Sequence, residues 1–255
     1  MIIVLLLGVV QGIAEFLPIS SSGHLIVAQY LFGVHSRGIA IEVALHMGTL
    51  LAVIMVYRRD IWQWVVAVHS PSGRRQLGTI IIGALPAAVI GFLAEKWIGQ
   101  YFIPQAVAVG WTLTAFLLWM TPGPSVGNRS LEQMTYKEAL GIGMFQALAL
   151  WPGLSRSGTT VFIGRHFGFA PDDAARFSFL LAIPTVLGAS ILSLPALVHA
   201  PSIPLSYLVM GIGIAAVSGL VAIQWVQRAL KGTASWRLFG LYTFGAAIVT
   251  WWVGG

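Results

Sequence analysis

The chain has 255 residues, of which 57% are hydrophobic and only 9% are charged. Soluble proteins carry about 25% charged residues, so the composition excludes an ordinary soluble domain, and it also excludes a disordered chain, which needs the opposite balance. The formal net charge of +6 is typical of basic cytoplasmic loops in a membrane protein rather than of nucleic-acid binding. The absence of cysteine excludes disulfides and thiolate chemistry. We therefore predict one all-α integral membrane domain over residues 1–255.

In chain order, the first apolar region is 1–34, and polar residues and a proline interrupt it between positions 15 and 24. A similar region, 139–166, is interrupted by Trp151-Pro152-Gly153 and by the polar residues that follow. Irregular backbone at membrane depth needs protein or a polar cavity around it, so we interpret both regions as re-entrant helical hairpins. The six remaining apolar stretches are predicted to span the membrane: 39–57, 77–94, 104–121, 177–198, 205–227 and 237–253.

Basic residues fall almost entirely on one side of this topology. Eleven Lys and Arg residues lie on one side, whereas only Arg37 and Lys96 lie on the other. The side rich in Lys and Arg is cytoplasmic in membrane proteins, so both termini are predicted to be outside the cytoplasm. The charge count would be the same if each hairpin were two full spans, but the polar residues at the breaks favour re-entrant hairpins.

The chain contains an internal repeat. Residues 11–24 align without gaps to 146–159 at a constant offset of 135, with five identities, and 83–91 also match 211–219. The repeat halves are roughly 1–122 and 139–255, and each holds one hairpin and three spans. Three spans are an odd number, so the halves are predicted to be inverted in the membrane, with a polar site near the midplane where the hairpin tips meet.

The first hairpin carries groups suited to nucleophilic catalysis. Gln11 and Glu15 share one face of a helix, and Pro18 ends that helix. His24 lies one helical turn after Ser21, so its imidazole could approach the Ser21 hydroxyl as an activating base. Glu42 could belong to this site or to the membrane interface, and His46 fits packing better.

The second hairpin carries groups suited to binding an anion. After the break at Pro152 and Gly153, Arg156 and several hydroxyls open a new helix, whose free N–H groups favour phosphate. Placing Glu15 and Arg156 at mid-membrane costs about 2.5–3.5 kcal/mol each. A buried ion pair that only fixes packing seldom adds net stability, so the cost favours a functional site.

These two segments resemble the signature motifs of the undecaprenyl-diphosphate phosphatase family, the bacitracin-resistance membrane proteins. The motif (Glu/Gln)-x-x-x-Glu stands at 11–15, with Gln as its first residue, and Pro-Gly-x-Ser-Arg-Ser-Gly-x-Thr stands at 152–160. The resemblance implies an enzyme of the bacterial inner membrane with its site facing the cell exterior. It also implies removal of the terminal phosphate from a C55 isoprenyl diphosphate, assisted by Mg²⁺ or Ca²⁺, to give the carrier lipid for peptidoglycan synthesis.

We therefore predict that His24 is the base for the nucleophile Ser21, and that Glu15 polarises His24 or binds the divalent cation. Arg156 is predicted to hold the diphosphate and to stabilise charge in the transition state. The other predicted substrate-binding residues are Gln11, Ser20, Ser22, Ser155, Ser157, Gly158 and Thr160. An attack by metal-activated water is the alternative mechanism.

The expected partners are the polyprenyl diphosphate lipid and the bilayer, without nucleic acid, and a homo-oligomer is compatible with the sequence. The alternative function is a transporter of the polyprenyl phosphate lipid, because inverted repeats with broken helices are also a transporter architecture.

Overall fold

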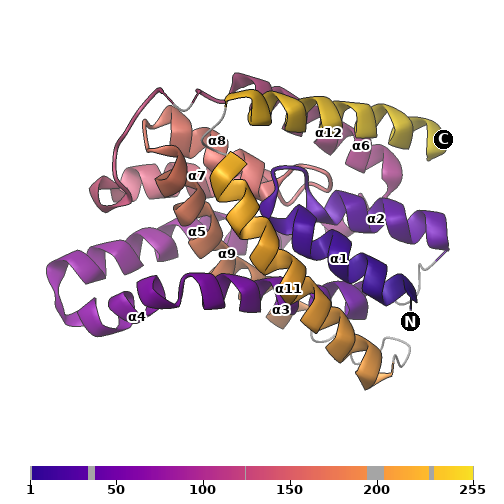
Figure 1. The fold of residues 1–255 in the computed structure, drawn as a ribbon, viewed down its shortest axis with the longest axis horizontal. Helices are drawn as coiled ribbons and strands as arrows, with labels where there is room; N and C mark the ends of the chain where they lie inside the picture. Colours follow the sequence, from indigo (N-terminus) through magenta and orange to yellow (C-terminus); the bar gives the residue numbers. More distant parts are fainter. Residues whose placement is uncertain (1, 34–37, 124, 194–203, 230–232, 255) are drawn as a thin grey trace.

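The computed structural model describes residues 2–33, 38–123, 125–193, 204–229 and 233–254, and within these ranges every regular element is a helix (Figure 1). The predicted all-α class is therefore confirmed. The α-helices are α1 (Ile2–Phe16), α2 (Ser21–Phe32), α3 (Gly38–Val56), α4 (Arg58–Val66), α5 (Pro71–Gly99), α6 (Pro104–Met120), α7 (Tyr136–Leu148), α8 (Arg156–His166), α9 (Pro171–Leu192), α11 (Leu205–Ala229) and α12 (Thr233–Val253).

Each of the six predicted spans coincides with a helix, but not every one of these helices is long and apolar enough to cross a bilayer. By length and hydropathy α5, α9 and α11 qualify, and α3 qualifies only together with α4, from which it is bent by 74°. Helix α6 is apolar but has only 17 residues. Residues 194–198, the predicted end of the fourth span, lie outside the described ranges. The chain is thus a multi-pass membrane protein with three helices among the described residues that are by themselves long and apolar enough to span a bilayer.

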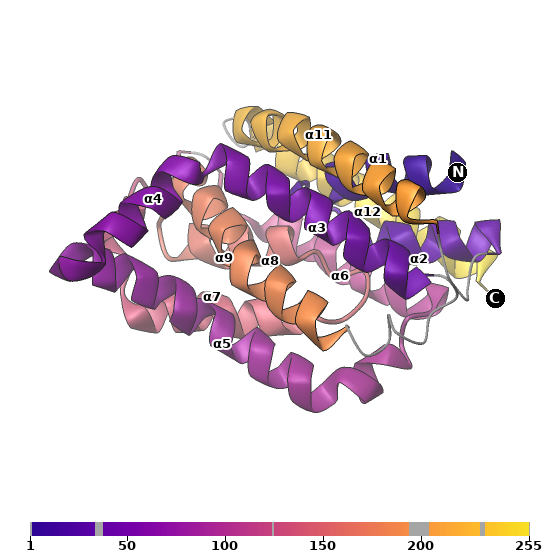
Figure 2. The same cartoon turned by 90° about the horizontal axis from the view of Figure 1, so that it is seen from below.

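Helix α4 was not predicted from the sequence. It follows α3 after a sharp turn at Tyr57, and its Asp60 forms an ion pair with Arg176 of α9. Figures 1 and 2 place α4 at one end of the long axis and both chain termini at the other end. The helices that carry the arginines at 58–59 and 74–75 therefore begin far from the termini.

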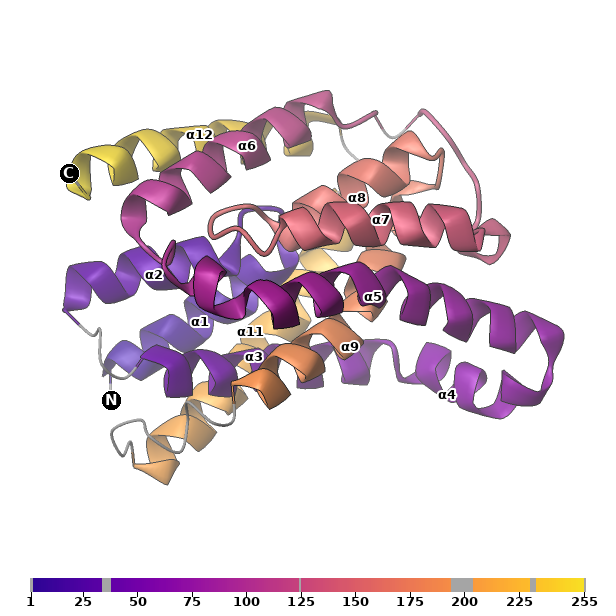
Figure 3. The same cartoon turned by 180° about the vertical axis from the view of Figure 1, so that it is seen from behind.

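The two predicted hairpins are present, and each is built from helices too short to cross a bilayer. Helices α1 and α2 have 15 and 12 residues, and α7 and α8 have 13 and 11. At 1.5 Å per residue these helices reach roughly 16–23 Å, against about 30 Å for the hydrocarbon core. Figure 3 shows α1 and α2 running between the terminal end of the molecule and its centre, whereas α7 and α8 extend toward the α4 end.

Both hairpin tips use the same capping device. The hydroxyl of Ser20 accepts the N–H of Gly23 at the start of α2, and the hydroxyl of Ser155 accepts the N–H of Gly158 at the start of α8. Ser20 also has a φ of 67°, which is uncommon for a residue other than glycine. Such backbone strain is often found at functional sites.

The tips meet in the centre of the protein, as predicted. The hydroxyl of Ser157 donates to the Leu17 carbonyl across the two tips at 3.0 Å. Helix α6 braces both of them, because the Trp111 indole donates to the Ile19 carbonyl at 2.7 Å and the Thr114 hydroxyl donates to the Gly153 carbonyl at 3.0 Å. Hydrogen bonds from neighbouring protein thus fix the backbone of both tips.

Close helix contacts hold the hairpins against the longer helices. Helix α1 packs along α11, and α7 packs along α5. A Cβ on Gly12 of α1 would lie 2.6 Å from the Ala215 carbonyl oxygen, and one on Gly143 of α7 would lie 2.3 Å from the Gly83 carbonyl oxygen. Small residues that let backbones approach this closely are typical of helix packing in membranes.

The outer faces of the helices are apolar rather than polar. Leu93 is 77% exposed and Trp252 is 82% exposed, and large apolar side chains cover the outward faces of most helices. Soluble proteins rarely expose such extensive apolar patches, so these faces fit contact with lipid.

Candidate active site

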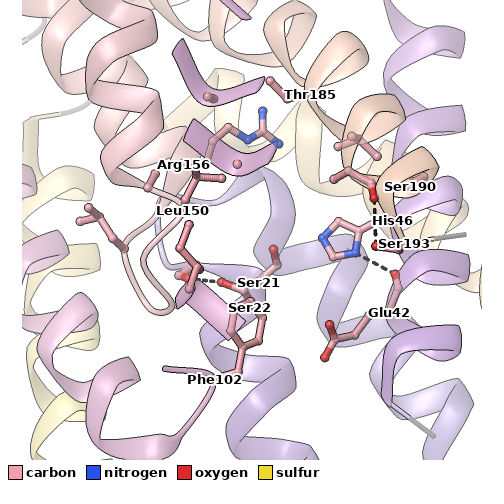
Figure 4. Close-up of a pocket in the computed structure, with 18 of the residues that line it drawn as sticks. Ser21, Ser22, Glu42, His46, Phe102, Leu150, Arg156, Thr185, Ser190 and Ser193 are labelled. Carbon is pink, nitrogen blue, oxygen red and sulfur yellow. Dashed lines mark hydrogen bonds between the residues drawn. The ribbon is translucent and has the colours of Figure 1, made fainter. Parts of the chain in front are cut away.

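A cavity of about 650 Å³ lies between the hairpin tips and helices α3, α5 and α9. Its polar end is formed by both tips and by one face of α3, and its remaining walls are largely apolar. Figure 4 shows Ser21, Ser22 and Arg156 on one side of the pocket and Glu42 and His46 on the other. The cavity therefore joins a polar pocket to an apolar space.

Glu15 is the centre of the polar network. Its Oε1 forms an ion pair with Arg156, and its Oε2 accepts a hydrogen bond from the Ser21 hydroxyl at 2.6 Å. Gln11 Nε2 also donates to Oε2 at 3.1 Å, and His46 Nε2 lies 3.7 Å from it. Glu15 is only 8% exposed, and these four side chains stabilise its carboxylate. The shared helix face predicted for Gln11 and Glu15 is confirmed.

Arg156 occupies the first position of α8, where it bridges two parts of the site. One guanidinium nitrogen reaches Glu15, and the other donates to the Ser178 carbonyl at 3.1 Å. The side chain is 17% exposed and lines the cavity. Arg156 and the Ser21 hydroxyl thus bind the two oxygens of the same Glu15 carboxylate.

Of the predicted substrate-binding residues, Gln11 is fully buried against Glu15 and does not line the cavity. The other six divide into two groups. Ser20, Ser22 and Ser155 line the cavity. Among the described residues that line it, the second tip contributes Ser155 and Arg156 but not the three residues behind them, Ser157, Gly158 and Thr160. Those three make structural hydrogen bonds: Ser157 to Leu17, Gly158 to Ser155, and Thr160 to the Ser178 hydroxyl. In this structure they hold the tip in place.

The predicted contact between His24 and Ser21 is not formed, which corrects the expected geometry. The His24 Nδ1 lies 2.7 Å from the Ser20 carbonyl oxygen, and its Nε2 lies 2.7 Å from the Tyr242 hydroxyl. The ring also packs edge-on against Trp111. Because Nδ1 bonds the carbonyl four residues earlier, the imidazole turns toward α6 and α12. The Ser21 hydroxyl faces Glu15 instead.

A second polar group lines the cavity opposite Ser21, and sequence reasoning undervalued it. His46 Nδ1 lies 2.7 Å from the Glu42 carbonyl oxygen, while Gln29 Nε2 donates to the Glu42 carboxylate at 2.6 Å. From the sequence, Glu42 could belong either to the site or to the membrane interface. In the structure it lines the cavity. The spacing of Glu42, His46 and Thr49 puts them on one helix face, and this was the available signal.

The backbone adds positive potential to the same place. Helices α2 and α8 both begin at the tips, α2 at Ser21 and α8 at Arg156, so both helix N-termini lie at the polar end of the cavity. Helix N-termini carry partial positive charge and favour bound anions. The described residues contain no group of three or more His, Asp or Glu side chains that could by themselves hold a metal ion.

These features define an all-helical, multi-pass membrane protein with a buried carboxylate–hydroxyl–guanidinium site. The chain belongs to the family described as Bacitracin resistance protein BacA, whose sequence pattern matches residues 4–249.

Three curated proteins that are similar to this chain are named undecaprenyl-diphosphatase. The undecaprenyl-diphosphatase of Alteromonas mediterranea is 39% identical and covers 88% of this chain and 90% of its own. Undecaprenyl-diphosphatase 4 of Bacillus thuringiensis is 36% identical over 96% of this chain and 93% of its own. The undecaprenyl-diphosphatase of Geobacter metallireducens is 40% identical over 88% of both chains.

Proposed function

We propose that this protein hydrolyses undecaprenyl diphosphate, a C55 isoprenyl diphosphate, to the monophosphate carrier lipid that supplies peptidoglycan synthesis. The observation that carries the proposal is the Ser21 hydroxyl 2.6 Å from Glu15, with Arg156 on the other carboxylate oxygen. A nucleophile, a base and a phosphate-binding cation are thus in contact. The names of the curated relatives support the same activity.

The shape of the cavity suits a lipid diphosphate. Its polar end offers Arg156 and the start of α8 to the phosphates. Its apolar wall is formed by residues of α5 and α9, of the segment after α5 and of the second tip, which would contact the isoprenyl chain: Ala87, Gly91, Ile98, Phe102, Leu150 and Val186. A soluble phosphate ester would leave this wall unused, so the lining favours a lipid substrate.

In the proposed reaction the Ser21 oxygen attacks the terminal phosphorus and its proton passes to Glu15. The bond between the terminal phosphorus and the bridging oxygen breaks, and undecaprenyl phosphate leaves with the electron pair. Water then hydrolyses the phosphoserine, releases inorganic phosphate and regenerates the Ser21 hydroxyl. Arg156 stabilises the charge on the equatorial oxygens. A phosphate that draws Arg156 away from Glu15 also makes that carboxylate a stronger base.

In this proposal His24 is a positioning residue rather than the base. Its bond to the Ser20 carbonyl supports the turn that presents Ser21. Glu15 takes the role of base because it is the acceptor that already holds the Ser21 proton donor.

The site fits a divalent cation only together with the substrate. Glu15 offers a carboxylate, and the Gln11 Oε1 is buried without a hydrogen-bond partner among the described residues. Mg²⁺ and Ca²⁺ prefer such oxygen ligands, and Mg²⁺ is commonly held by one or two carboxylates and substrate phosphates. We therefore propose that Glu15 and Gln11 would hold Mg²⁺ or Ca²⁺, which when bound would neutralise phosphate charge.

Phosphate release by the purified protein tests the function. In detergent micelles it should release one inorganic phosphate per undecaprenyl diphosphate, and a chelator should reduce the rate. The Glu15→Gln variant is the control for a contaminating phosphatase. The transporter alternative predicts the opposite: movement of the lipid phosphate across vesicles without any phosphate release.

We also propose that the fold is an inverted repeat of six membrane-crossing helices and two hairpins, with both termini outside the cytoplasm and the site open to the exterior of the inner membrane. The packing of each hairpin on a helix of the other half supports the repeat. Helix α1 of the first half packs on α11 of the second, and α7 of the second half packs on α5 of the first. The hairpins point in from opposite ends (Figure 3). The bias of basic residues supports the orientation.

Helix α5 provides a direct test of the orientation. Its 29 residues extend roughly 44 Å, enough to cross the bilayer. In this cysteine-free chain, Ser72→Cys should react with an impermeant thiol reagent only from the cytoplasmic side, and Gln100→Cys only from the outside. The unmodified protein is the blank. The opposite labelling pattern would overturn the proposed orientation, and labelling of both from one side would overturn α5 as a span.

A further inference from the structure

Gln146 of α7 is a buried polar side chain whose hydrogen-bonding capacity is entirely unused. It is 2% exposed, and neither Nε2 nor Oε1 has a hydrogen-bond partner among the described residues. It also lines the site cavity, where its neighbours on the same segment are Ala149 and Leu150. Buried polar groups in native proteins are nearly always paired, so an orphaned amide requires an explanation.

The internal repeat shows why this amide lacks a partner within its own hairpin. Gln146 aligns with Gln11, and both lie near the end of the first helix of their hairpin. Gln11 donates to Glu15 four residues later, but the residue four after Gln146 is Leu150. The second hairpin thus keeps the amide and lacks the carboxylate that would bond it. Its amide is left without a partner among the described residues, in a side chain that lines the same cavity as Arg156.

We infer that Gln146 is a substrate-binding residue whose Nε2 donates a hydrogen bond to a phosphate oxygen of the bound diphosphate. This inference rests on the proposed function. An amide donor suits this position because it binds an anion without adding a second buried charge beside Arg156, which a lysine or arginine would do. Without substrate the Nε2 donor has no hydrogen-bond partner among the described residues, and a bound phosphate oxygen would provide one.

Replacement of Gln146 by methionine distinguishes a role in binding substrate from a role in stabilising the fold. Gln146→Met has a similar volume but no donor, so the empty protein should be as stable as the native one or more stable in thermal unfolding. The same change should weaken binding of inorganic pyrophosphate about tenfold, measured as the loss of ligand-induced thermal stabilisation. In turnover KM should rise about tenfold while kcat changes less than twofold, because the contact is present in both ground and transition states.

Gln29→Met is the matched control. Gln29 is also a buried glutamine of the cavity wall, but it donates to Glu42. Its loss removes this hydrogen bond from the half-buried Glu42 carboxylate, so this variant should be less stable than the native protein. Opposite changes in stability for the two glutamines would support the inference.

Three results would overturn it. The first is pyrophosphate binding and KM at native values in Gln146→Met. The second is a clear loss of stability in both Gln146→Met and Gln146→Leu, which would make the amide a structural group. The third is a collapse of kcat rather than a rise of KM in Gln146→Met, while the native protein binds pyrophosphate and releases phosphate normally. A native protein that neither binds pyrophosphate nor releases phosphate would instead reject the proposed function, and the inference with it.

Discussion

Replacement of Arg156 by lysine should lower kcat/KM for the lipid diphosphate by about tenfold or more. The guanidinium bridges Glu15 and the Ser178 carbonyl while facing the cavity. A lysine ammonium keeps the charge but loses the planar two-pronged donor, and one lost hydrogen bond to a charged group is worth about 1.5–3 kcal/mol. Arg156→Ala should be worse still, because it also leaves Glu15 buried without its cation. Steady-state phosphate release measures both effects.

Arg165 provides the control for this experiment. It lies on the same helix and is 1% exposed, but it binds the backbone carbonyls of Gly123, Val126 and Phe169 instead of the site. Arg165→Lys should therefore lower the unfolding temperature and leave KM unchanged. Native turnover in both Arg156 variants would remove Arg156 from the phosphate site.

Ser21→Ala should abolish turnover, with a loss of at least about 10³-fold, because the variant lacks the attacking oxygen. Ser20→Ala and Ser22→Ala should lose less, since the Glu15 carboxylate accepts the hydroxyl of Ser21 and their hydroxyls lie beside each other at 3.2 Å. Glu15→Gln should be nearly as damaging as Ser21→Ala. The double variant should be little worse than either single one, because residues that act as a unit are non-additive.

The same series tests the competing mechanisms. His24→Ala should cost less than Ser21→Ala, because the His24 ring bonds Ser20 and Tyr242 and not the nucleophile. Rapid quenching during turnover should yield a phosphorylated peptide that contains Ser21. Substantial activity in Ser21→Ala, with Glu15→Gln as the dominant loss, would favour attack by metal-activated water and reject the serine mechanism. The phosphatase assignment would stand.

Most of the helical framework could be predicted from hydropathy and from the two polar breaks. The breaks at 17–20 and 149–155 are readable because proline, glycine and serine interrupt apolar runs. Helix α4 could not be predicted, because its sequence is short and mixed and its direction depends on the ion pair of Asp60 with Arg176. Span counting from hydropathy also treats each apolar run as a straight helix, whereas α3 and α4 are joined by a 74° bend.

The chemical groups of the site were determined by the sequence alone: a carboxylate, serines and an arginine at two breaks in apolar segments. Local spacing could place Gln11 and Glu15 on one helix face, because four residues make just over one helical turn. It could not choose the partner of Ser21. The ring of His24 and the carboxylate of Glu15 were both within reach along the chain. The imidazole is instead held by the Ser20 carbonyl and by Tyr242 of α12 and Trp111 of α6. The contact of Glu15 with Arg156, 141 residues apart, and the recruitment of His46 likewise depend on how separate helices pack. Such contacts join residues that are distant in the chain, so no regular spacing in the sequence reveals them.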